Sequence, residues 1–281
     1  MSQNPWTHKI HLSFGFFDGE MPPKIKKALK KLRDQNSNMQ IKIWGPKESR
    51  HLIATKYPWA LKKYDSFKWP IQRSDMSRPA ILHAEGGTYM DLDYKLKKPL
   101  SKIMEHLSGA YPEGEVFINR SPNSLGPSSL SNSLMLAKQP GHPFWLHFLK
   151  RISEVHGNGR GFTRYTKIMS STGPEAISRA YHAYDKNERD KVIPLPPSVF
   201  NPCSICDRGS ACAHAPGVLA VHKNDSSWHS GTAKVYRHFY CNRIMYYILV
   251  PCVIAVVIVI IIVCLRLKRC RSTCAPCKFK K

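Results

Sequence analysis

Two carboxylates stand one residue apart in "GGTYMDLDYK", residues 86–95. We interpret "TYMDL" as a strand that ends in a turn. Because side-chain direction along a strand repeats every two residues, Asp91 and Asp93 would point to the same side. Two hard carboxylate oxygens suit Mg²⁺ or Mn²⁺ and leave other coordination positions for water and a diphosphate. The pair indicates a metal site for a phosphate-bearing ligand; a solvated acidic surface is the plain alternative for a lone pair of this kind.

A second charged pair precedes the first on a predicted helix over residues 71–85. Asp75 and Arg78 are three residues apart and therefore share one face of that helix. Gly86 and Gly87 follow and can take the positive φ that a helix C-terminus often needs. The helix, the glycine turn and the strand carry both charged pairs in one short segment.

Short strands alternate with helices through residues 8–222. This alternation predicts an α/β fold, with a mostly parallel central sheet and helices on both faces. We expect strands at residues 8–14, 39–44, 88–92, 115–119 and 132–137. We expect helices after Pro22, over residues 71–85 and 142–156, and from Pro174.

The chain is strongly basic, with a formal net charge of +24 from 43 Lys and Arg against 19 Asp and Glu. Such a balance suggests an anionic partner, and a solvated lysine surface is the plain alternative. No zinc finger, helix-turn-helix or aromatic RNA-binding motif appears, so a nucleic-acid partner is disfavoured.

Residues 246–265, "YYILVPCVIAVVIVIIIVCL", contain no charged side chain and predict one transmembrane helix. Residues 266–281 form a basic, Cys-containing tail, which the positive-inside rule places in the cytosol and which puts the N-terminal part in a lumen. The start of the chain lacks the charged segment and apolar run of a secretory signal. The catalytic side of the membrane is therefore left open at this stage.

Cysteines cluster in two places. Residues 201–214 contain Cys203, Cys206 and Cys212 with His214, which could form a zinc site, a disulfide with one spare thiol, or a plain loop. Five of the nine cysteines lie in or behind the apolar helix, where palmitoylation is an interpretation. They are Cys252, Cys264, Cys270, Cys274 and Cys277.

The string "PIQRSDMSRPAILHAEGGTYMDLD" resembles the signature of DXD glycosyltransferases that carry the sugar-binding region of the capsular-polysaccharide and yeast mannosyltransferase type. Further segments are similar, in order and spacing, to the fungal inositol phosphorylceramide mannosyltransferases. They are "KIHLSFG", "YPWALKKYDSFKWPIQRSD", "SNSLMLAKQPGHPF", "STGPEAIS" and "AVHKNDSSWH".

This resemblance implies a GT-A fold over residues 1–240, with the D-x-D motif at 91–93. It also implies a retaining transfer of mannose from GDP-mannose, with Mn²⁺ or Mg²⁺ as cofactor. A lipid acceptor would place the enzyme in sphingolipid glycosylation, in the Golgi or another endomembrane. The sequence does not identify the acceptor, the donor sugar or the oligomeric state by itself.

The resemblance also implies roles for individual residues. Asp91 and Asp93 would be the catalytic metal-binding pair, with His222 or His229 as a further ligand. Asn132 is the acceptor-site candidate. The residues expected to bind the donor are Asp75, Arg78, Ser226, Ser227 and Trp228.

Two alternatives remain at this stage. The same donor chemistry could act on a glycan or protein acceptor, because acceptor pockets lie in variable loops. A catalytically dead, basic membrane protein that binds nucleic acid or anionic lipid is the other. The intact Asp75, Arg78, Asp91 and Asp93 disfavour it.

Overall fold

The computed structural model describes residues 6–17, 19–122, 129–207, 211–223 and 231–273. The chain divides into two compact units, residues 1–229 and residues 230–281.

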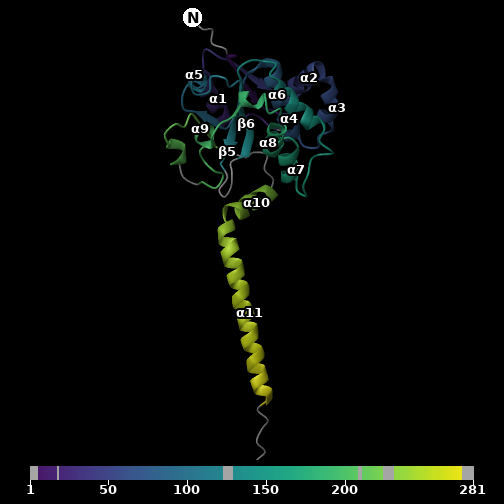
Figure 1. Ribbon diagram of the computed structural model, residues 1–281, viewed down its shortest axis with the longest axis vertical. Helices are drawn as coiled ribbons and strands as arrows, with labels where there is room; N and C mark the ends of the chain where they lie inside the picture. The colour runs from purple at the N-terminus through teal and green to yellow at the C-terminus, as the bar shows by residue number, and fades with distance from the viewer. Residues whose placement is uncertain (1–5, 18, 123–128, 208–210, 224–230, 274–281) are drawn as a thin grey trace, which may run out of the picture. The chain divides into compact units, whose positions relative to one another are not determined.

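A six-stranded sheet forms the centre of the first unit (Figure 1). Its strands are β1 (Lys9–Ser13), β2 (Gln40–Trp44), β3 (Gly87–Met90), β5 (Val116–Ser121), β6 (Ser129–Ala137) and β7 (Val192–Pro194). Their order is β2-β1-β3-β6-β5-β7, and only β6 runs antiparallel to its neighbours. The prediction of a mostly parallel sheet is therefore confirmed, and all five expected strands are present.

Helices surround this sheet, and proline opens most of them because its missing N–H has no intrahelical partner at the first helical position. They are α1 (Pro23–Gln35), α2 (Pro46–Lys56), α3 (Pro58–Ser66), α4 (Pro70–Glu85), α5 (Leu100–Ala110), α6 (Pro143–Ser153), α7 (Arg164–Ser171), α8 (Pro174–His182) and α9 (Pro197–Phe200). The expected helices correspond to α1, α4, α6 and α8.

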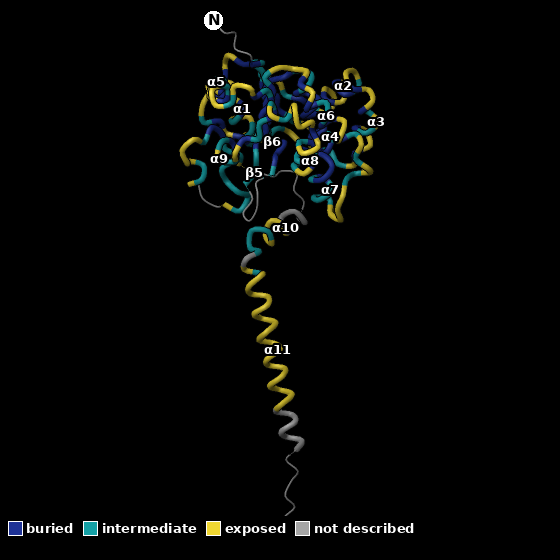
Figure 2. Tube along the Cα trace, viewed as in Figure 1, coloured by how far each residue is buried: buried dark blue, intermediate teal, exposed yellow. Residues whose placement is uncertain are grey.

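Two apolar clusters cover opposite faces of the sheet. Alternate residues of one strand enter different clusters: Met135 packs with α4, α6 and α8, whereas Leu134 and Leu136 pack with α1 and α5. Side chains of successive strand residues point to opposite faces, so a strand buried on both sides reads as a continuous apolar run. Figure 2 shows this buried interior in dark blue.

α4 is buried over most of its length and runs unbroken through Pro79. Gly86 follows it with φ +63°, as predicted for the helix C-terminus. Gly87 has φ +80°, and a Cβ there would lie 2.6 Å from the carbonyl oxygen of Lys9. Glycine at residue 87 therefore lets β3 pack directly beside β1.

A second, two-stranded sheet lies in the same unit. It pairs β4 (Tyr94–Leu96) antiparallel with β8 (Ala220–His222). The cysteine segment before β8 contains a Cys203–Cys212 disulfide, and Cys206 is disulfide-bonded as well. The zinc interpretation is wrong for this segment, because oxidised sulfurs are not thiolate ligands. The disulfide interpretation is confirmed for Cys203 and Cys212, but Cys206 is not a spare thiol.

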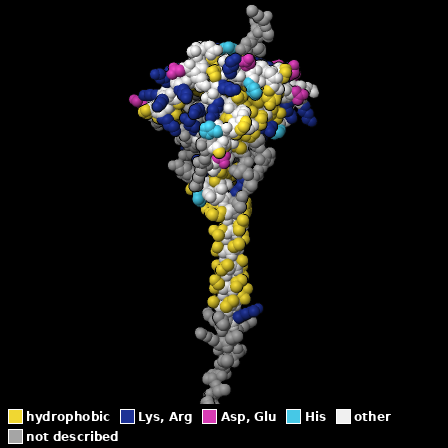
Figure 3. Space-filling model, turned by 90° about the vertical axis from the view of Figure 1, so that its left-hand side faces the viewer, with side chains coloured by type: hydrophobic (Ala, Val, Ile, Leu, Met, Phe, Trp, Pro, Cys, Tyr) yellow, Lys and Arg dark blue, Asp and Glu magenta, His cyan; other side chains and the backbone are white. Residues whose placement is uncertain are grey.

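The second unit contains α10 (Gly231–Cys241) and α11 (Arg243–Thr273). Within α11, Met245–Arg266 has a mean hydropathy of 3.6, and none of its most apolar window is buried. Figure 2 shows the apolar part of α11 in yellow, as exposed, and Figure 3 shows its apolar side chains. The segment is long and apolar enough to cross a membrane and includes the predicted span 246–265.

Candidate metal and donor-sugar site

The D-x-D pair lies in the turn that follows β3, not on the strand itself. Met90 is the last strand residue, and the Asp91 N–H donates to the carbonyl of Ser133 at 2.8 Å. Asp93 then immediately precedes β4. The prediction that the pleat of a strand directs both carboxylates to one side is therefore wrong, because the turn after β3 directs them.

The small sheet brings a histidine to this turn. Tyr94 and His222 are register partners in the β4–β8 pair, and their rings stack at 4.5 Å with an interplanar angle of 2°. His222 Nε2 lies 3.0 Å from Asp93 Oδ1, and the Lys223 N–H donates to the Asp93 carbonyl. Strand pairing thus places His222 beside Asp93.

Asp91, Asp93 and His222 form a group whose ligand atoms all lie within 4.8 Å of one another. Their side chains are 27%, 16% and 14% exposed, so the group reaches solvent while resting on the buried sheet. Two carboxylate oxygens and one imidazole nitrogen can together hold a divalent metal ion.

Arg78 connects the two charged pairs. Its Nη2 lies 3.1 Å from Asp75 Oδ1 and 3.1 Å from Asp91 Oδ1, while Nη1 donates to the Asn132 carbonyl at 2.8 Å. The guanidinium also lies over the ring of Tyr89, 4.9 Å from its centroid. With a side chain 6% exposed, Arg78 holds both carboxylates in place from beneath the site.

Burial and pairing set the charge states of these groups. Burial raises the pKa of Asp75 to about 6, although Arg78 and a hydrogen bond from Thr172 oppose the rise. Burial also raises the pKa of Asp91, and Arg78 again opposes it. Burial lowers the pKa of Arg78, but Asp91, Tyr89 and Asp75 together raise it by more than burial lowers it. The guanidinium therefore stays charged.

A buried polar network supports the His222 side of the site. The Tyr94 hydroxyl accepts a hydrogen bond from Asn119 Nδ2 at 2.5 Å and lies 3.0 Å from Ser133 Oγ. Ser133 Oγ in turn lies 2.9 Å from Ser131 Oγ. The network orients the tyrosine ring on which His222 stacks. Sequence reasoning missed Tyr94, because an aromatic at the start of a strand is an ordinary core residue.

The remaining predicted residues divide into two groups. Asn132 is buried, its carbonyl accepts from Arg78 Nη1, and its Nδ2 donates to the Thr172 carbonyl, so it adjoins the Asp75–Arg78 pair. Thr172 itself, which sequence reasoning did not single out, donates to Asp75 Oδ2 at 3.0 Å. Ser226, Ser227, Trp228 and His229 lie outside the described residues.

Residues 22–109 match the family described as the glycosyltransferase sugar-binding region containing the DXD motif. This segment includes Asp75, Arg78, Asp91 and Asp93, and within it Arg78 contacts Asp75 and Asp91. Residues 22–109 are therefore similar to the sugar-binding region of the DXD glycosyltransferases, as the resemblance implied.

Among curated relatives, inositol phosphoceramide mannosyltransferase 3 of Schizosaccharomyces pombe is 33% identical over 59% of this chain and 43% of its own length. The Saccharomyces cerevisiae protein mannosyl phosphorylinositol ceramide synthase SUR1 is 28% identical over 77% of this chain and 50% of its own. An uncharacterized glycosyltransferase of Acanthamoeba polyphaga mimivirus is 23% identical over 82% of this chain and 86% of its own. The chain spans about half the length of the fungal relatives.

Solved glycosyltransferases show a loose likeness. The glycosyltransferase domain of the YGT toxin has a TM-score of 0.48 at 9% identity, covering 67% of this chain and 80% of that domain. Mouse xyloside xylosyltransferase 1 has a TM-score of 0.41 at 15% identity, covering 78% of this chain and 85% of that protein.

Proposed function

We propose that this chain is a membrane-anchored, metal-dependent glycosyltransferase of the GT-A type. In this proposal it transfers mannose from GDP-mannose to the inositol-phosphate head group of a sphingolipid, with retention of configuration. The observation that carries the proposal is the convergence of Asp91, Asp93 and His222 beside the buried Asp75–Arg78 pair; all of these residues except His222 lie in the segment that matches the DXD sugar-binding region. The names of the fungal relatives support the donor and the acceptor class.

Each part of the site has a role in this proposal. Asp91, Asp93 and His222 would hold the Mn²⁺, which when bound neutralises charge that develops on the departing diphosphate. Asp75 accepts hydrogen bonds from sugar hydroxyls, and Arg78 fixes its carboxylate. Because Arg78 already pairs with two carboxylates and a backbone carbonyl, its role is to position Asp75 and Asp91.

The membrane span and the disulfide together favour a lumenal catalytic unit. The tail after Arg266 is basic, which favours the cytosolic side for the C-terminal end of α11. The Cys203–Cys212 disulfide favours an oxidising compartment for the first unit. We propose the Golgi or a related endomembrane as its location.

The test is transfer of radiolabelled sugar from a panel of nucleotide sugars to extracted lipids, with the full chain in detergent micelles. We expect label from GDP-mannose in the inositol-phosphate sphingolipid fraction, dependence on Mn²⁺, and loss of at least about a hundredfold in rate for Asp93→Ala. Asp34→Ala, which removes an exposed carboxylate of α1, is the matched control and should transfer normally.

The other outcomes separate the alternatives. Label on a glycan or protein fraction would keep the transferase and replace the lipid acceptor. Full transfer by Asp93→Ala would contradict the metal site. A protein that neither transfers nor hydrolyses any donor, yet retains DNA or anionic lipid in a salt-sensitive way, would be the inactive binding protein.

Figure 3 shows Lys and Arg scattered over the visible face of the first unit, without the single stripe that nucleic-acid binding favours.

A further inference from the structure

A cavity of about 380 Å³ lies among α6, α7, α8 and the loop after α6. None of the metal-group residues lines it. It adjoins the site through α7, because Ser171 in its wall accepts a hydrogen bond from Gln72, one turn before Asp75 on α4. The residues that carry its chemistry are Arg151, Glu154, His156, Arg160, Ser170 and Arg179.

The lining is cationic, with three arginines against one glutamate. Arg179 pairs with Glu175 and donates to the Ser170 carbonyl. Arg151 and Arg160 are exposed, and within the described part of the chain neither side chain has a salt-bridge partner. Two guanidinium groups are thus available to an anion, and their planar fork geometry suits the oxygens of a phosphate.

The loop that presents Arg160 is held in one conformation. Lys63 Nζ donates to the carbonyl of Val155, and Gln72 Nε2 donates to the carbonyl of Asn158 at 3.0 Å. Ser170 Oγ accepts from the Arg160 N–H at 2.8 Å and donates to its carbonyl at 2.9 Å. The backbone of Arg160 therefore stands at the cavity before any ligand arrives, so binding would order only its side chain.

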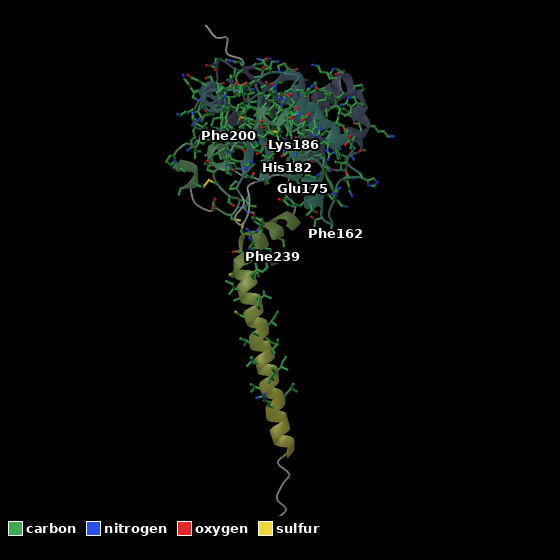
Figure 4. All side chains as sticks on the ribbon, viewed as in Figure 1. Phe162, Glu175, His182, Lys186, Phe200 and Phe239 are labelled. Carbon is green, nitrogen blue, oxygen red and sulfur yellow. A yellow bond between two sulfur atoms is a disulfide. The ribbon has the colours of Figure 1, made fainter. Side chains whose placement is uncertain are left out.

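Phe162 stands at the tip of the same loop, two residues after Arg160, and is fully exposed at 104% (Figure 4). Gly161, with φ +108°, turns the loop against α7, where a Cβ would lie 2.3 Å from Thr166 Oγ1. Thr163 then caps α7. The backbone on both sides of Phe162 is thus fixed while its ring is held in solvent.

The membrane-spanning segment of the chain indicates which kind of partner this surface contacts. The apolar segment Met245–Arg266 begins 22 positions after Lys223, the last described residue of the first unit. A unit tethered by so short a connection stays near any membrane that this segment spans, since 22 residues reach roughly 75 Å even when fully extended. Aromatic rings favour the membrane interface, and basic residues near it are attracted to anionic lipids.

We propose that this cavity is a second site, which binds the phosphate of an anionic membrane lipid, with Arg151 and Arg160 on the phosphate and Phe162 in the interfacial layer. The proposal of this lipid site depends on the membrane span and does not depend on the transfer chemistry. It would orient the first unit on the bilayer independently of donor binding.

The test uses the full chain in nanodiscs of phosphatidylcholine alone and of phosphatidylcholine with phosphatidylinositol. We measure hydrogen exchange of the amides in residues 156–164. Exchange should slow at least about fivefold in the anionic discs, the attraction expected for a single basic residue at such a surface. Arg151→Gln with Arg160→Gln, and separately Phe162→Ser, should abolish that protection.

Matched controls are Lys186→Gln, an exposed cation outside the cavity, and Trp59→Ala, an exposed aromatic of α3, and both should keep the protection. Phe162→Ser removes only a solvent-exposed ring, so it tests the proposal even where the double variant fails to fold. Equal exchange in the two kinds of disc would overturn the proposal. So would equal protection by inorganic phosphate in detergent micelles, which would assign the cavity to a soluble anion. Sugar transfer is a separate readout, so failure here leaves the proposed enzyme untouched.

Discussion

Replacing Arg78 by methionine tests the electrostatic framework of the site. Methionine has a similar length and packs against apolar neighbours, but it removes the charge shared by Asp75 and Asp91. The hydrogen bond to the Asn132 carbonyl and the contact with the Tyr89 ring are lost as well. Asp75, 4% exposed, would keep only neutral donors such as Thr172.

The size of the effect follows from burial. Removing one partner of a buried ion pair costs about 3–5 kcal/mol, because the other charge is left uncompensated. Burial already raises the pKa of Asp75 to about 6 with Arg78 in place, and the variant loses the main opposing interaction. The pKa of Asp75 in the folded variant therefore rises further above its value in the unfolded chain.

The sign of the pH dependence follows from this rise. In the variant the folded state binds protons more tightly than the unfolded state, so the free energy of unfolding increases as the pH falls. The increase is at most about 1.4 kcal/mol per pH unit for each uncompensated carboxylate, and it ends near the ordinary pKa of 3.8. The deficit of Arg78→Met should accordingly be largest at pH 8 and shrink toward pH 5.

Urea unfolding of the detergent-solubilised chain, followed by tryptophan fluorescence, measures this free energy. Arg50→Met is the matched control, since it breaks an ion pair with Asp65 that is half exposed on both sides and should cost little. Asp75→Asn combined with Arg78→Met should recover part of the loss. A deficit no larger than that of Arg50→Met, or one that does not change with pH, would refute the reasoning.

Three further predictions concern the sheet and the cysteine segment. Burial lowers the pKa of His11 to about 4, so below pH 6.5 the unfolded chain binds a proton that the folded chain does not bind. As the pH falls from 6.5 to 4, the free energy of unfolding should therefore decrease by about 3 kcal/mol more in the unchanged protein than in His11→Gln. Urea titration at each pH measures this difference. Gly87→Ala should lower the free energy of unfolding by about 1–3 kcal/mol, because residue 87 has a positive φ and its backbone packs against β1. Gly109→Ala in α5 should not lower it, because a Cβ there meets no neighbouring atom within 4 Å. Thermal unfolding compares the two variants. Replacing Cys203 and Cys212 together by serine should cost about 2–4 kcal/mol, and an unchanged melting temperature would show that this disulfide does not constrain the unfolded chain.

The local pattern of the sequence was enough to predict the Asp75–Arg78 pair and the D-x-D pair as site residues. Asp75 and Arg78 lie on α4, and Asp91 and Asp93 lie in the turn directly after β3. The helix, the glycine turn and the short strand that lead to this turn follow one another, and each of them has a short-range signal. The helix ends at Gly86 as predicted, and the strand begins where it was expected. The apolar span within α11 was equally readable, since length and composition alone define it.

Other features depended on contacts between distant segments. His222 and His229 were equal candidates in the sequence, and the pairing of β4 with β8 places His222 against Asp93. Thr172 reaches Asp75 only because α7 packs beside α4.

The sequence by itself determined which residues could carry the chemistry and the elements on which most of them lie, because propensity, glycine geometry and apolar periodicity act over a few neighbouring residues. The tertiary structure alone decided that His222 joins the carboxylates, that Cys203 pairs with Cys212, and that Arg151 and Arg160 share a cavity. The physical reason is that such contacts depend on which distant surfaces bury each other, and that choice is made by the packing of the whole unit.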